Sequence, residues 1–325
     1  MSKGCVSVII PCYNYGHFLP RAVASVVAQT YRNWEIIIVN DGSTDDTEEV
    51  SNSLINEGLS IRYLDRKENM GPSFTRNEGI AAANGEYLAF LDADDEWFSE
   101  KLEKQIEVFS GNPSVGLVAT GVTLKDVNKC VERYYQPEKF ADKRALVRSL
   151  LIRNIVPATS SVMVRKSCFE NVGGFDKNFR FAEDWELWLR LIRECGFEFI
   201  YEPLITLYEH QSNASRAILK MGASREKIIR AHYPWMRENG YATKTDFFKA
   251  LSYCYLDNAR GYNNLRIDRK RLLVNAAKAI LYYPPKCNIK DDKYQILIKN
   301  ILPATLVKVL KRLKPGGSDK NENAC

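Results

Sequence analysis

The sequence predicts an α/β fold, a mostly parallel sheet flanked by helices, followed by a helical C-terminal region. Two observations lead to this prediction. Over the first two thirds of the chain, strand-like and helix-like patterns alternate with short connections, which is typical of parallel strands joined by helices. After about residue 215, one helical pattern follows another. The length of 325 residues, the hydrophobic fraction of 45% and the charged fraction of 26% suit a globular protein of one large domain or two.

The expected strands are short runs rich in β-branched and aromatic residues. The first four alternate with helices and lie over 6–10, 34–39, 61–64 and 85–91. Beyond them the strand signals are more widely spaced, over 115–123, 160–164 and 199–208.

The expected helices show apolar residues at helical spacing. Three of them have recognisable boundary residues: Pro20 fits a first turn, Ser43 or Thr44 caps the next helix, and Pro234 ends a later one. The helices are expected over 18–29, from 45 onward, and over 72–84, 141–151, 183–195, 224–233, 245–258, 268–281 and 294–313.

These patterns predict three parts of the chain. A mixed α/β domain is expected over 1–220, a helical region over 221–314 and a disordered polar tail over 315–325. In the helical region, lysines alternate with leucine, isoleucine and valine. Such a basic amphipathic surface suits peripheral contact with an anionic membrane. The alternative is a helix that packs its apolar face on the first domain and leaves lysine outside.

The eight cysteines are scattered, and no Cys-x-x-Cys pair occurs. This distribution favours free thiols over a zinc site or a disulfide framework. No apolar run approaches the roughly 20 residues that a transmembrane helix needs. We therefore expect a cytoplasmic protein, with the inner face of the cell membrane as a peripheral location.

An acidic cluster directly follows the buried strand predicted over 85–91. Asp92, Asp94 and Asp95 would repel one another unless a cation or a hydrogen-bonding ligand lay there. Clustered carboxylate oxygens suit Mg²⁺ or Mn²⁺, which in turn would hold a diphosphate. The alternative is an Asp-rich turn that caps the next helix.

Polar and aromatic side chains also follow the other early strands. Tyr13 comes after the first strand and Asp41 after the second. Because ligands bind at the carboxyl ends of parallel strands, Tyr13 is placed to stack on a base and Asp41 to accept from a base or ribose. Neither a Gly-x-Gly-x-x-Gly nor a Gly-x-x-x-x-Gly-Lys-Ser/Thr motif occurs, which argues against dinucleotide oxidoreductases and P-loop enzymes.

Five sequence blocks follow one another in the first part of the chain. They are Val-Ser-Val-Ile-Ile-Pro-Cys-Tyr-Asn at 6–14, Gln-Thr-Tyr at 29–31, Ile-Ile-Val-Asn-Asp-Gly-Ser-Thr-Asp at 37–45, Gly-Pro-Ser-Phe-Thr-Arg-Asn-Glu-Gly at 71–79 and Leu-Asp-Ala-Asp-Asp at 91–95. In this order they resemble the blocks of the family-two inverting glycosyltransferases of GT-A fold. The resemblance covers about residues 5–215, and the order of the blocks makes it specific.

The resemblance implies a nucleotide-sugar donor, usually a UDP-sugar, and a Mg²⁺ or Mn²⁺ ion on an Asp-x-Asp motif. Pro11, Tyr13 and Asp41 match the contacts to the base and ribose. Asp92 and Asp94 match the Asp-x-Asp pair. Asp92 thus serves both the donor and the metal, and Asp94 is the more direct metal ligand.

Arg76 lies in the helix after Gly71 and Pro72. A lone arginine on a helix is ordinarily a surface residue. Within this block it resembles the family's segment near the donor, so the resemblance favours a donor-binding role.

A second acidic pair, Glu183 and Asp184, opens the helix expected over 183–195. Asp184 begins an apolar stripe, so its carboxyl group points into the structure. Burial would raise its pKa and the helix N-terminus would lower it. The alternative is a charge that only interacts with the helix dipole. The block from 181 to 188 resembles the family's Glu-Asp block, in which the Asp is the general base, so Asp184 is the expected catalytic residue.

His210 is one of three histidines. A lone histidine after a strand is ordinarily structural or exposed. The block from 208 to 215 resembles one that approaches the diphosphate or metal in relatives, which makes His210 a further candidate metal ligand.

The resemblance therefore implies a metal-dependent, inverting hexosyltransferase with a saccharide or lipid-linked acceptor and no nucleic-acid partner. Synthesis of bacterial surface polysaccharide or lipid-linked glycan is the expected context. Two alternatives stay open. One is a non-catalytic nucleotide-sugar-binding subunit, against which the intact acidic blocks argue. The other is a nucleotidyltransferase, which ordinarily opens with a Gly-rich basic loop unlike 11–16.

Overall fold

The computed structural model describes residues 2–126, 130–209, 217–264 and 268–283. Its strands are β1 Ser2–Cys12, β2 Trp34–Asp41, β3 Ile61–Arg66, β4 Gly85–Phe90, β5 Glu96–Trp97, β6 Val115–Asp126, β7 Val131–Tyr135, β8 Val162–Arg165 and β9 Gly196–Glu209. Its α-helices are α1 Leu19–Val27, α2 Thr47–Asn56, α3 Pro72–Ala82, α4 Lys101–Gly111, α5 Lys143–Ile152, α6 Cys168–Val172, α7 Glu183–Glu194, α8 Ala217–Glu238, α9 Lys244–Asn264 and α10 Arg269–Tyr282. Two 3₁₀ turns cover Gly16–Phe18 and Thr159–Ser161.

In the described residues the strands form one mixed, mostly parallel sheet. Its order is β3-β2-β1-β4-β8-β6-β9-β5, and β7 pairs with β6. The first four strands are parallel, and β8 is antiparallel to both β4 and β6, while β6 and β9 are again parallel. The predicted α/β fold is confirmed, because β1, β2 and β4 place their carboxyl ends at one edge.

The central strands are buried on both faces, as parallel strands covered by helices are. Ile9 and Phe90 point to the face that α5, α7 and the helical region cover. Ile10 and Leu91 point to the other face, which α1 and α4 cover. This period-two alternation fixes the register of each strand, because a slip of one residue would exchange the two faces.

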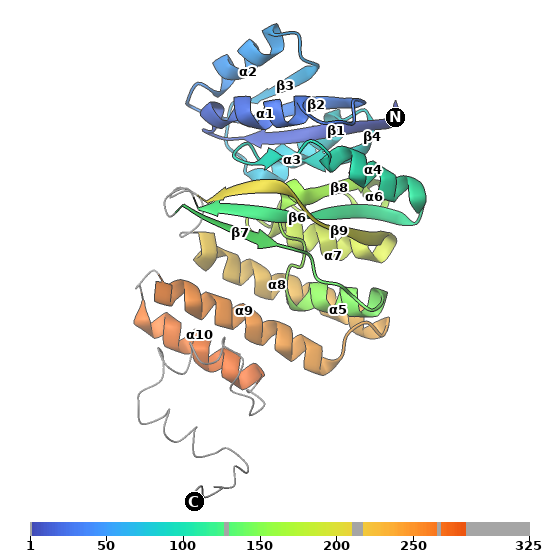
Figure 1. The fold of residues 1–325 in the computed structure, drawn as a ribbon. Helices are drawn as coiled ribbons and strands as arrows, with labels where there is room; N and C mark the ends of the chain where they lie inside the picture. The colour runs from blue at the N-terminus through green and yellow to red at the C-terminus, as the bar shows by residue number, and fades with distance from the viewer. Residues whose placement is uncertain (1, 127–129, 210–216, 265–267, 284–325) are drawn as a thin grey trace, which may run out of the picture.

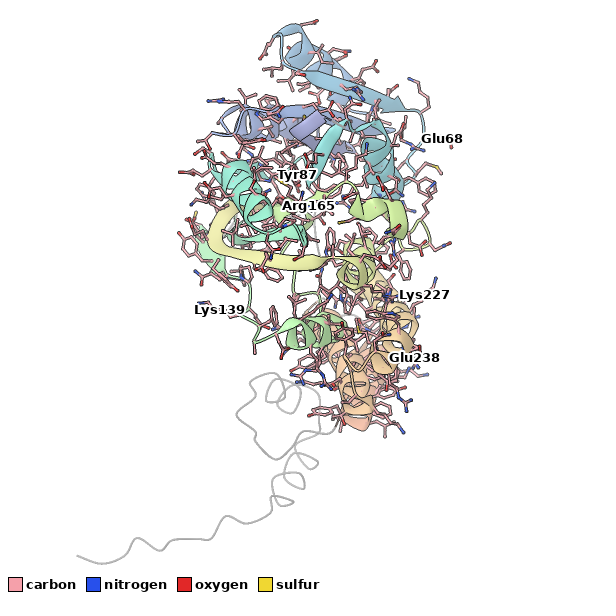
Figure 2. All side chains as sticks on the ribbon, turned by 90° about the vertical axis from the view of Figure 1, so that its right-hand side faces the viewer. Glu68, Tyr87, Lys139, Arg165, Lys227 and Glu238 are labelled. Atoms are coloured by element: carbon pink, nitrogen blue, oxygen red, sulfur yellow. The ribbon has the colours of Figure 1, made fainter. Side chains whose placement is uncertain are left out.

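The helical C-terminal region is confirmed and packs beneath the sheet domain. Figure 1 shows α8, α9 and α10 in succession below the sheet, and the quarter-turned view of Figure 2 shows them again at the same end. Buried residues of α8 and α9, including Ile228 and Leu251, belong to the same apolar cluster as α5 and α7. The region is therefore joined to the sheet domain by a shared core.

Several predicted helix boundaries are wrong: α8 begins at Ala217 rather than at 224, and α9 ends at Asn264 rather than at 258. Two other boundaries have a physical reason. The helix expected to end at Pro234 continues to Glu238, because the buried Met236 in its last turn outweighs the hydrogen bond that proline removes. The helix expected after a Ser43 or Thr44 cap begins only at Thr47, with Asp46 at its N-cap. The Ser43 hydroxyl instead accepts a hydrogen bond from the backbone N–H of Asn14.

Helix α4 lay outside the predicted pattern. Its buried face includes Lys101 and Gln105 beside Leu102 and Phe109, so polar residues interrupt the apolar spacing. The ammonium group of Lys101 donates to the Gln105 side chain at 2.8 Å and lies 4.0 Å from the ring centroid of Trp97. The helix expected over 294–313 and the tail over 315–325 fall outside the described residues.

Among the helices described, none is both long and apolar enough to cross a membrane. The six cysteines in this part of the chain are unpaired, and Cys5, Cys12 and Cys254 are buried.

The close approach of α3 to the sheet gives a stability prediction. A Cβ added at Gly79 would lie 2.4 Å from the buried Ile9 side chain, whereas one added at Gly111 in α4 would meet nothing within 4 Å. We expect Gly79→Ala to lower the free energy of unfolding by about 1–3 kcal/mol through overpacking. Gly111→Ala, the matched control, should leave it equal or slightly higher. Urea unfolding of both variants measures the difference, and equal effects would contradict the packing argument.

Candidate active site

The turn after β4 carries the acidic cluster and is closed by hydrogen bonds. The backbone N–H of Asp95 donates to the carbonyl of Asp92 at 3.0 Å. Ser160, from the 3₁₀ turn before β8, accepts from the backbone N–H of Asp92 at 3.0 Å and donates to the Asp95 carboxylate at 2.5 Å. These bonds keep the side chains of Asp92 and Asp94 at the edge of the sheet, where both line a cavity.

The pKa of Asp95 reflects the charges that surround it in this turn. Burial, together with the charges of Asp92 and Asp94, raises the pKa of Asp95 well above its usual range, and the Ser160 hydrogen bond only partly opposes this. The turn therefore gathers three carboxyl groups whose mutual repulsion a divalent cation would relieve.

The side chains that could ligate such a cation fit it only in part. In the described stretches of the chain, no group of three His, Cys, Asp or Glu side chains is arranged to hold a metal. Mg²⁺ commonly uses one or two carboxylates together with substrate phosphates and water. Asp92 and Asp94 thus suit a cation that a bound diphosphate completes, rather than one that the protein encloses.

Arg76, in the middle of α3, joins the acidic turn to the start of α7. Its guanidinium donates to the Asp92 carboxylate at 2.8 Å and to the Glu183 carboxylate at 2.8 Å. The Arg76 side chain is 7% exposed and that of Glu183 is 12% exposed. Burial alone would lower the pKa of Arg76, but the charges of Asp92 and Glu183 raise it, so the guanidinium stays protonated. The arginine is a buried structural bridge that also lines the cavity.

Asp41, at the end of β2, holds the loop before α3. Its two carboxylate oxygens accept from the backbone N–H groups of Met70 and Gly71, at 2.9 and 2.8 Å. Gly71 adopts a φ of 91°, a left-handed conformation that favours glycine, and serves as the N-cap of α3. Asp41 therefore positions the helix that carries Arg76 while it also lines the cavity.

Tyr13 follows β1 and is 46% exposed. The next residue, Asn14, has a φ of 56° and joins two loops. Its backbone N–H donates to Ser43, and its side-chain oxygen accepts from the backbone N–H of Thr44 at 2.8 Å. This cross-link fixes the loop after β1 against the loop after β2, with Tyr13 at the wall of the cavity.

The cavity at this edge of the sheet has a volume of about 800 Å³. It brings together the residues that the sequence singled out for the donor and the metal, namely Pro11, Tyr13, Asp41, Arg76, Asp92 and Asp94. His210 lies outside the described residues. Asn69 and Arg180 also line the cavity, their side chains lie 3.4 Å apart, and the sequence did not single out Arg180. A lone arginine in a loop gives no sequence signal, because only the fold brings it to the cavity.

Asp184 does not line the cavity that the Arg76 bridge borders. Ala182, with φ 59° and ψ 27°, turns the chain sharply into α7. Glu183 then faces Arg76 and the first cavity, whereas Asp184 lines a second cavity and accepts from the Asn154 amide at 3.0 Å.

Burial raises the pKa of Asp184, and the charge of Asp92 adds to the rise, although Arg76, Asn154 and the Trp185 backbone oppose it. A carboxylate with a raised pKa at a cavity wall is suited to accept a proton. The Glu-Asp helix and the acidic turn, which lie far apart in the sequence, thus meet through Arg76.

This bridge predicts a large loss of stability on its removal. Arg76→Gln leaves two carboxylates without their shared cation, so we expect the free energy of unfolding to fall by about 3–5 kcal/mol. The matched control is Arg66→Gln, which removes an ion pair with Glu78 whose partners are 24% and 36% exposed. That change should cost less than about 1 kcal/mol. Urea unfolding compares the two, and similar losses would show that burial of the bridge contributes little.

Residues 7–173, about half of the chain, match the family described as Glycosyl transferase family 2. The Bacillus subtilis protein TuaG, provisionally described as a teichuronic acid biosynthesis glycosyltransferase, is 33% identical over 242 residues, 71% of this chain and 91% of TuaG. The Escherichia coli UDP-Glc:alpha-D-GlcNAc-diphosphoundecaprenol beta-1,3-glucosyltransferase WfgD is 29% identical over 208 residues, 61% of this chain and 76% of WfgD.

Two solved structures share the fold. The S. aureus TarS 1-349 complex with UDP-GlcNAc has a TM-score of 0.55 and 18% identity, over 86% of this chain and 89% of that chain. The mannosyltransferase PcManGT from Pyrobaculum calidifontis, in complex with GDP-Man and Mn²⁺, has a TM-score of 0.54 and 19% identity, over 95% of this chain and 81% of that chain. With the sheet order, the acidic turn and the family match in agreement, this chain belongs to glycosyl transferase family 2 and has the GT-A fold.

Proposed function

We propose that this glycosyltransferase is metal-dependent and inverting, and that it moves a sugar from a UDP-sugar to a hydroxyl group of a saccharide or lipid-linked acceptor. The observation that carries the proposal is the Arg76 bridge, which sets the acidic turn beside the start of α7. The E. coli relative, whose name gives a UDP-glucose donor, supports the choice of nucleotide.

The first cavity is the proposed donor site. The exposed ring of Tyr13 stacks on the base, and Pro11 and Asp41 contact the base and ribose at this end of the cavity. Asp92 and Asp94 would hold Mn²⁺ or Mg²⁺, which when bound neutralises charge on the diphosphate. Arg180 and Asn69 line the same cavity and add polar contacts on its other wall.

Asp184 is the proposed general base. Its carboxylate takes the proton of the acceptor hydroxyl as that oxygen bonds to the anomeric carbon of the donor sugar. The bond from this carbon to the diphosphate oxygen breaks in the same step, so the configuration inverts. Arg76 and Asn154 act as positioning residues: Arg76 holds the turn and the helix together, and Asn154 orients the Asp184 carboxylate.

Two substitutions separate the roles of the acidic residues. Asp94→Asn should weaken Mn²⁺-dependent binding of UDP by about tenfold or more and also abolish transfer. Asp184→Asn should leave UDP binding unchanged and lower turnover by about 10²–10⁴-fold. Calorimetric titration of UDP with MnCl₂ or with EDTA measures binding, and nucleotide release from a panel of UDP-sugars measures turnover. Normal turnover by Asp184→Asn would exclude it as the base.

The hydrogen bond from Asn154 gives a pH prediction. Because this bond lowers the pKa of Asp184, Asn154→Ala should raise that pKa further above its usual range. The base acts only when ionised, so the acidic limb of kcat/KM should move to higher pH while the plateau at high pH is largely kept. Asn178→Ala, at an exposed residue whose side-chain amide donates to Asp176, is the control. An unchanged limb in Asn154→Ala would disconnect Asp184 from the rate-determining proton transfer.

A further inference from the structure

Cys168 and Cys195 bring two thiol groups together from different helices. Cys168 is the first residue of α6, and Cys195 directly follows the last residue of α7. Both are partly exposed, and both pack against the apolar cluster that the sheet and the helices share. Neither residue lines the first or the second cavity, so the pair is separate from the proposed donor site.

Gly116 of β6 leaves the room that both sulfur atoms occupy. A Cβ at this glycine would lie 2.4 Å from Sγ of Cys195 and 2.5 Å from Sγ of Cys168. The two sulfur atoms therefore lie beside the same glycine, and a hydrogen bond joins the two side chains. Two thiols in such close contact can form a disulfide with little movement of the backbone.

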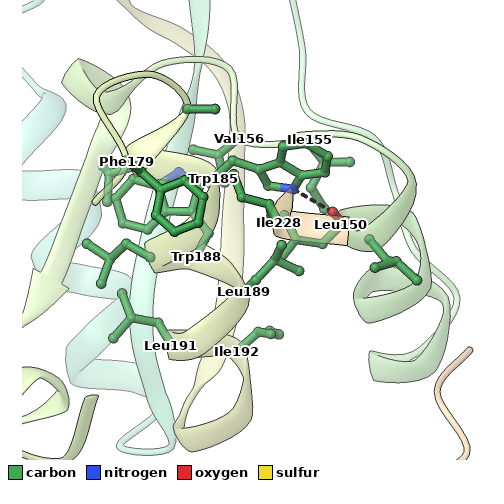
Figure 3. Close-up of a cluster of buried hydrophobic side chains, with 14 of the residues drawn as sticks. Leu150, Ile155, Val156, Phe179, Trp185, Trp188, Leu189, Leu191, Ile192 and Ile228 are labelled. Atoms are coloured by element: carbon green, nitrogen blue, oxygen red, sulfur yellow. Dashed lines mark hydrogen bonds between the residues drawn. The ribbon is translucent and has the colours of Figure 1, made fainter. Parts of the chain in front are cut away.

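The end of α7 that carries Cys195 is held in place by packing and by backbone hydrogen bonds. Figure 3 shows Trp188 and Leu191 of α7 among packed apolar side chains, and both are fully buried. The backbone N–H of Cys195 donates to the carbonyl of Leu191 at 3.0 Å, and that of Gly196 donates to the carbonyl of Ser114 at 2.9 Å. The fold itself thus keeps the thiol of Cys195 beside its partner.

The two thiols differ in how readily they ionise. The hydrogen bond from Cys195 lowers the pKa of Cys168, the charge of Arg165 adds to this effect, and burial opposes it only in part. The same hydrogen bond, together with burial, raises the pKa of Cys195 above its usual range. Because the thiolate is the form that attacks a disulfide, Cys168 is the attacking thiol and Cys195 the second to react.

We propose that Cys168 and Cys195 form a modification site, at which a small-molecule disulfide such as oxidised glutathione converts the two thiols into a reversible disulfide between α6 and α7. The Cys168 thiolate bonds to one sulfur of the oxidant, and the other sulfur leaves as a thiolate. Sγ of Cys195 then loses its proton and bonds to Sγ of Cys168, which expels the second thiolate. The two leaving thiolates take up the two protons that the cysteines release. The cysteines are oxidised by two electrons, and the oxidant is reduced to two thiols.

The disulfide closes the segment 168–195, which contains Arg180, Glu183 and Asp184. It fastens the end of α7 opposite to the two acidic residues, about 18 Å away at 1.5 Å per helical residue. Since the two sulfur atoms are already in contact, we expect the bond to stabilise this segment without displacing the start of α7. A closed loop stabilises chiefly by restricting the unfolded chain. The inference does not depend on the proposed function.

The test exposes the full chain, first reduced and then freed of reductant, to oxidised glutathione. Trypsin places the two cysteines in separate peptides, 167–177 and 194–216, so mass spectrometry detects their cross-link directly. We expect the linked peptide in the parent, its release by dithiothreitol, and a rise in Tm of about 3–6 °C over the reduced protein. Absence of this linked peptide would overturn the proposal.

Single substitutions separate the roles of the two thiols. Cys195→Ser should retain one glutathione on Cys168, because the second thiol is missing, whereas Cys168→Ser should leave Cys195 unmodified. Cys130→Ser, which removes an exposed thiol outside the pair, is the matched control and should form the cross-link as the parent does. Circular dichroism checks that all variants fold. Equal glutathione uptake at the remaining cysteine of the pair in the first two variants would overturn the assignment of Cys168 as the attacking thiol.

The proposed function is tested by other measurements. No nucleotide, metal or sugar takes part in the disulfide experiment. A parent that shows no metal-dependent binding of UDP would contradict the proposed function and leave the thiol pair unaffected, whereas a missing cross-link would contradict only the thiol pair.

Discussion

The buried ion bridge of Arg76 is the interaction on which the site depends. One guanidinium, 7% exposed, satisfies carboxylates from the turn after β4 and from the start of α7. Burial raises the pKa of Glu183, and the charge of Arg76 opposes that rise. The arginine reaches both carboxylates because α3 packs closely on β1, where Gly79 leaves no room for a Cβ beside Ile9. The site geometry is thus set by helix–sheet packing.

Adjacent carboxylates at the start of α7 have different partners. Glu183 forms an ion pair with Arg76, whereas the Asp184 carboxylate accepts from the Asn154 amide. Burial raises the pKa of both carboxyl groups. The left-handed conformation of Ala182 directs the two side chains to separate cavities. Two neighbouring carboxylates of equal charge thus differ in their surroundings: Glu183 is an ion-pair partner, and Asp184 accepts a hydrogen bond from an amide.

The helical region is anchored to α7 by a second buried polar group. The Arg193 guanidinium donates to Nδ1 of His232 at 2.6 Å, and Nε2 of the same ring lies 3.4 Å from the Glu186 carboxylate. Since a guanidinium can only donate, Nδ1 is an acceptor, and the proton of the neutral ring lies on Nε2 toward Glu186. This contact fixes α8 against α7, the helix that begins with Glu183 and Asp184.

The sequence by itself determined the succession of the early strands along the chain and the residues at their carboxyl ends, because apolar runs and polar strand ends are local patterns. Pro11, Tyr13, Asp41 and the acidic turn could be predicted to share one edge for that reason. Only the tertiary structure decided that Arg76 is buried and bridges Asp92 and Glu183, and that Arg180 reaches the cavity. It also decided that α8 continues past Pro234 and closes a second cavity. Each of these depends on packing between segments far apart in the chain, which no local pattern records.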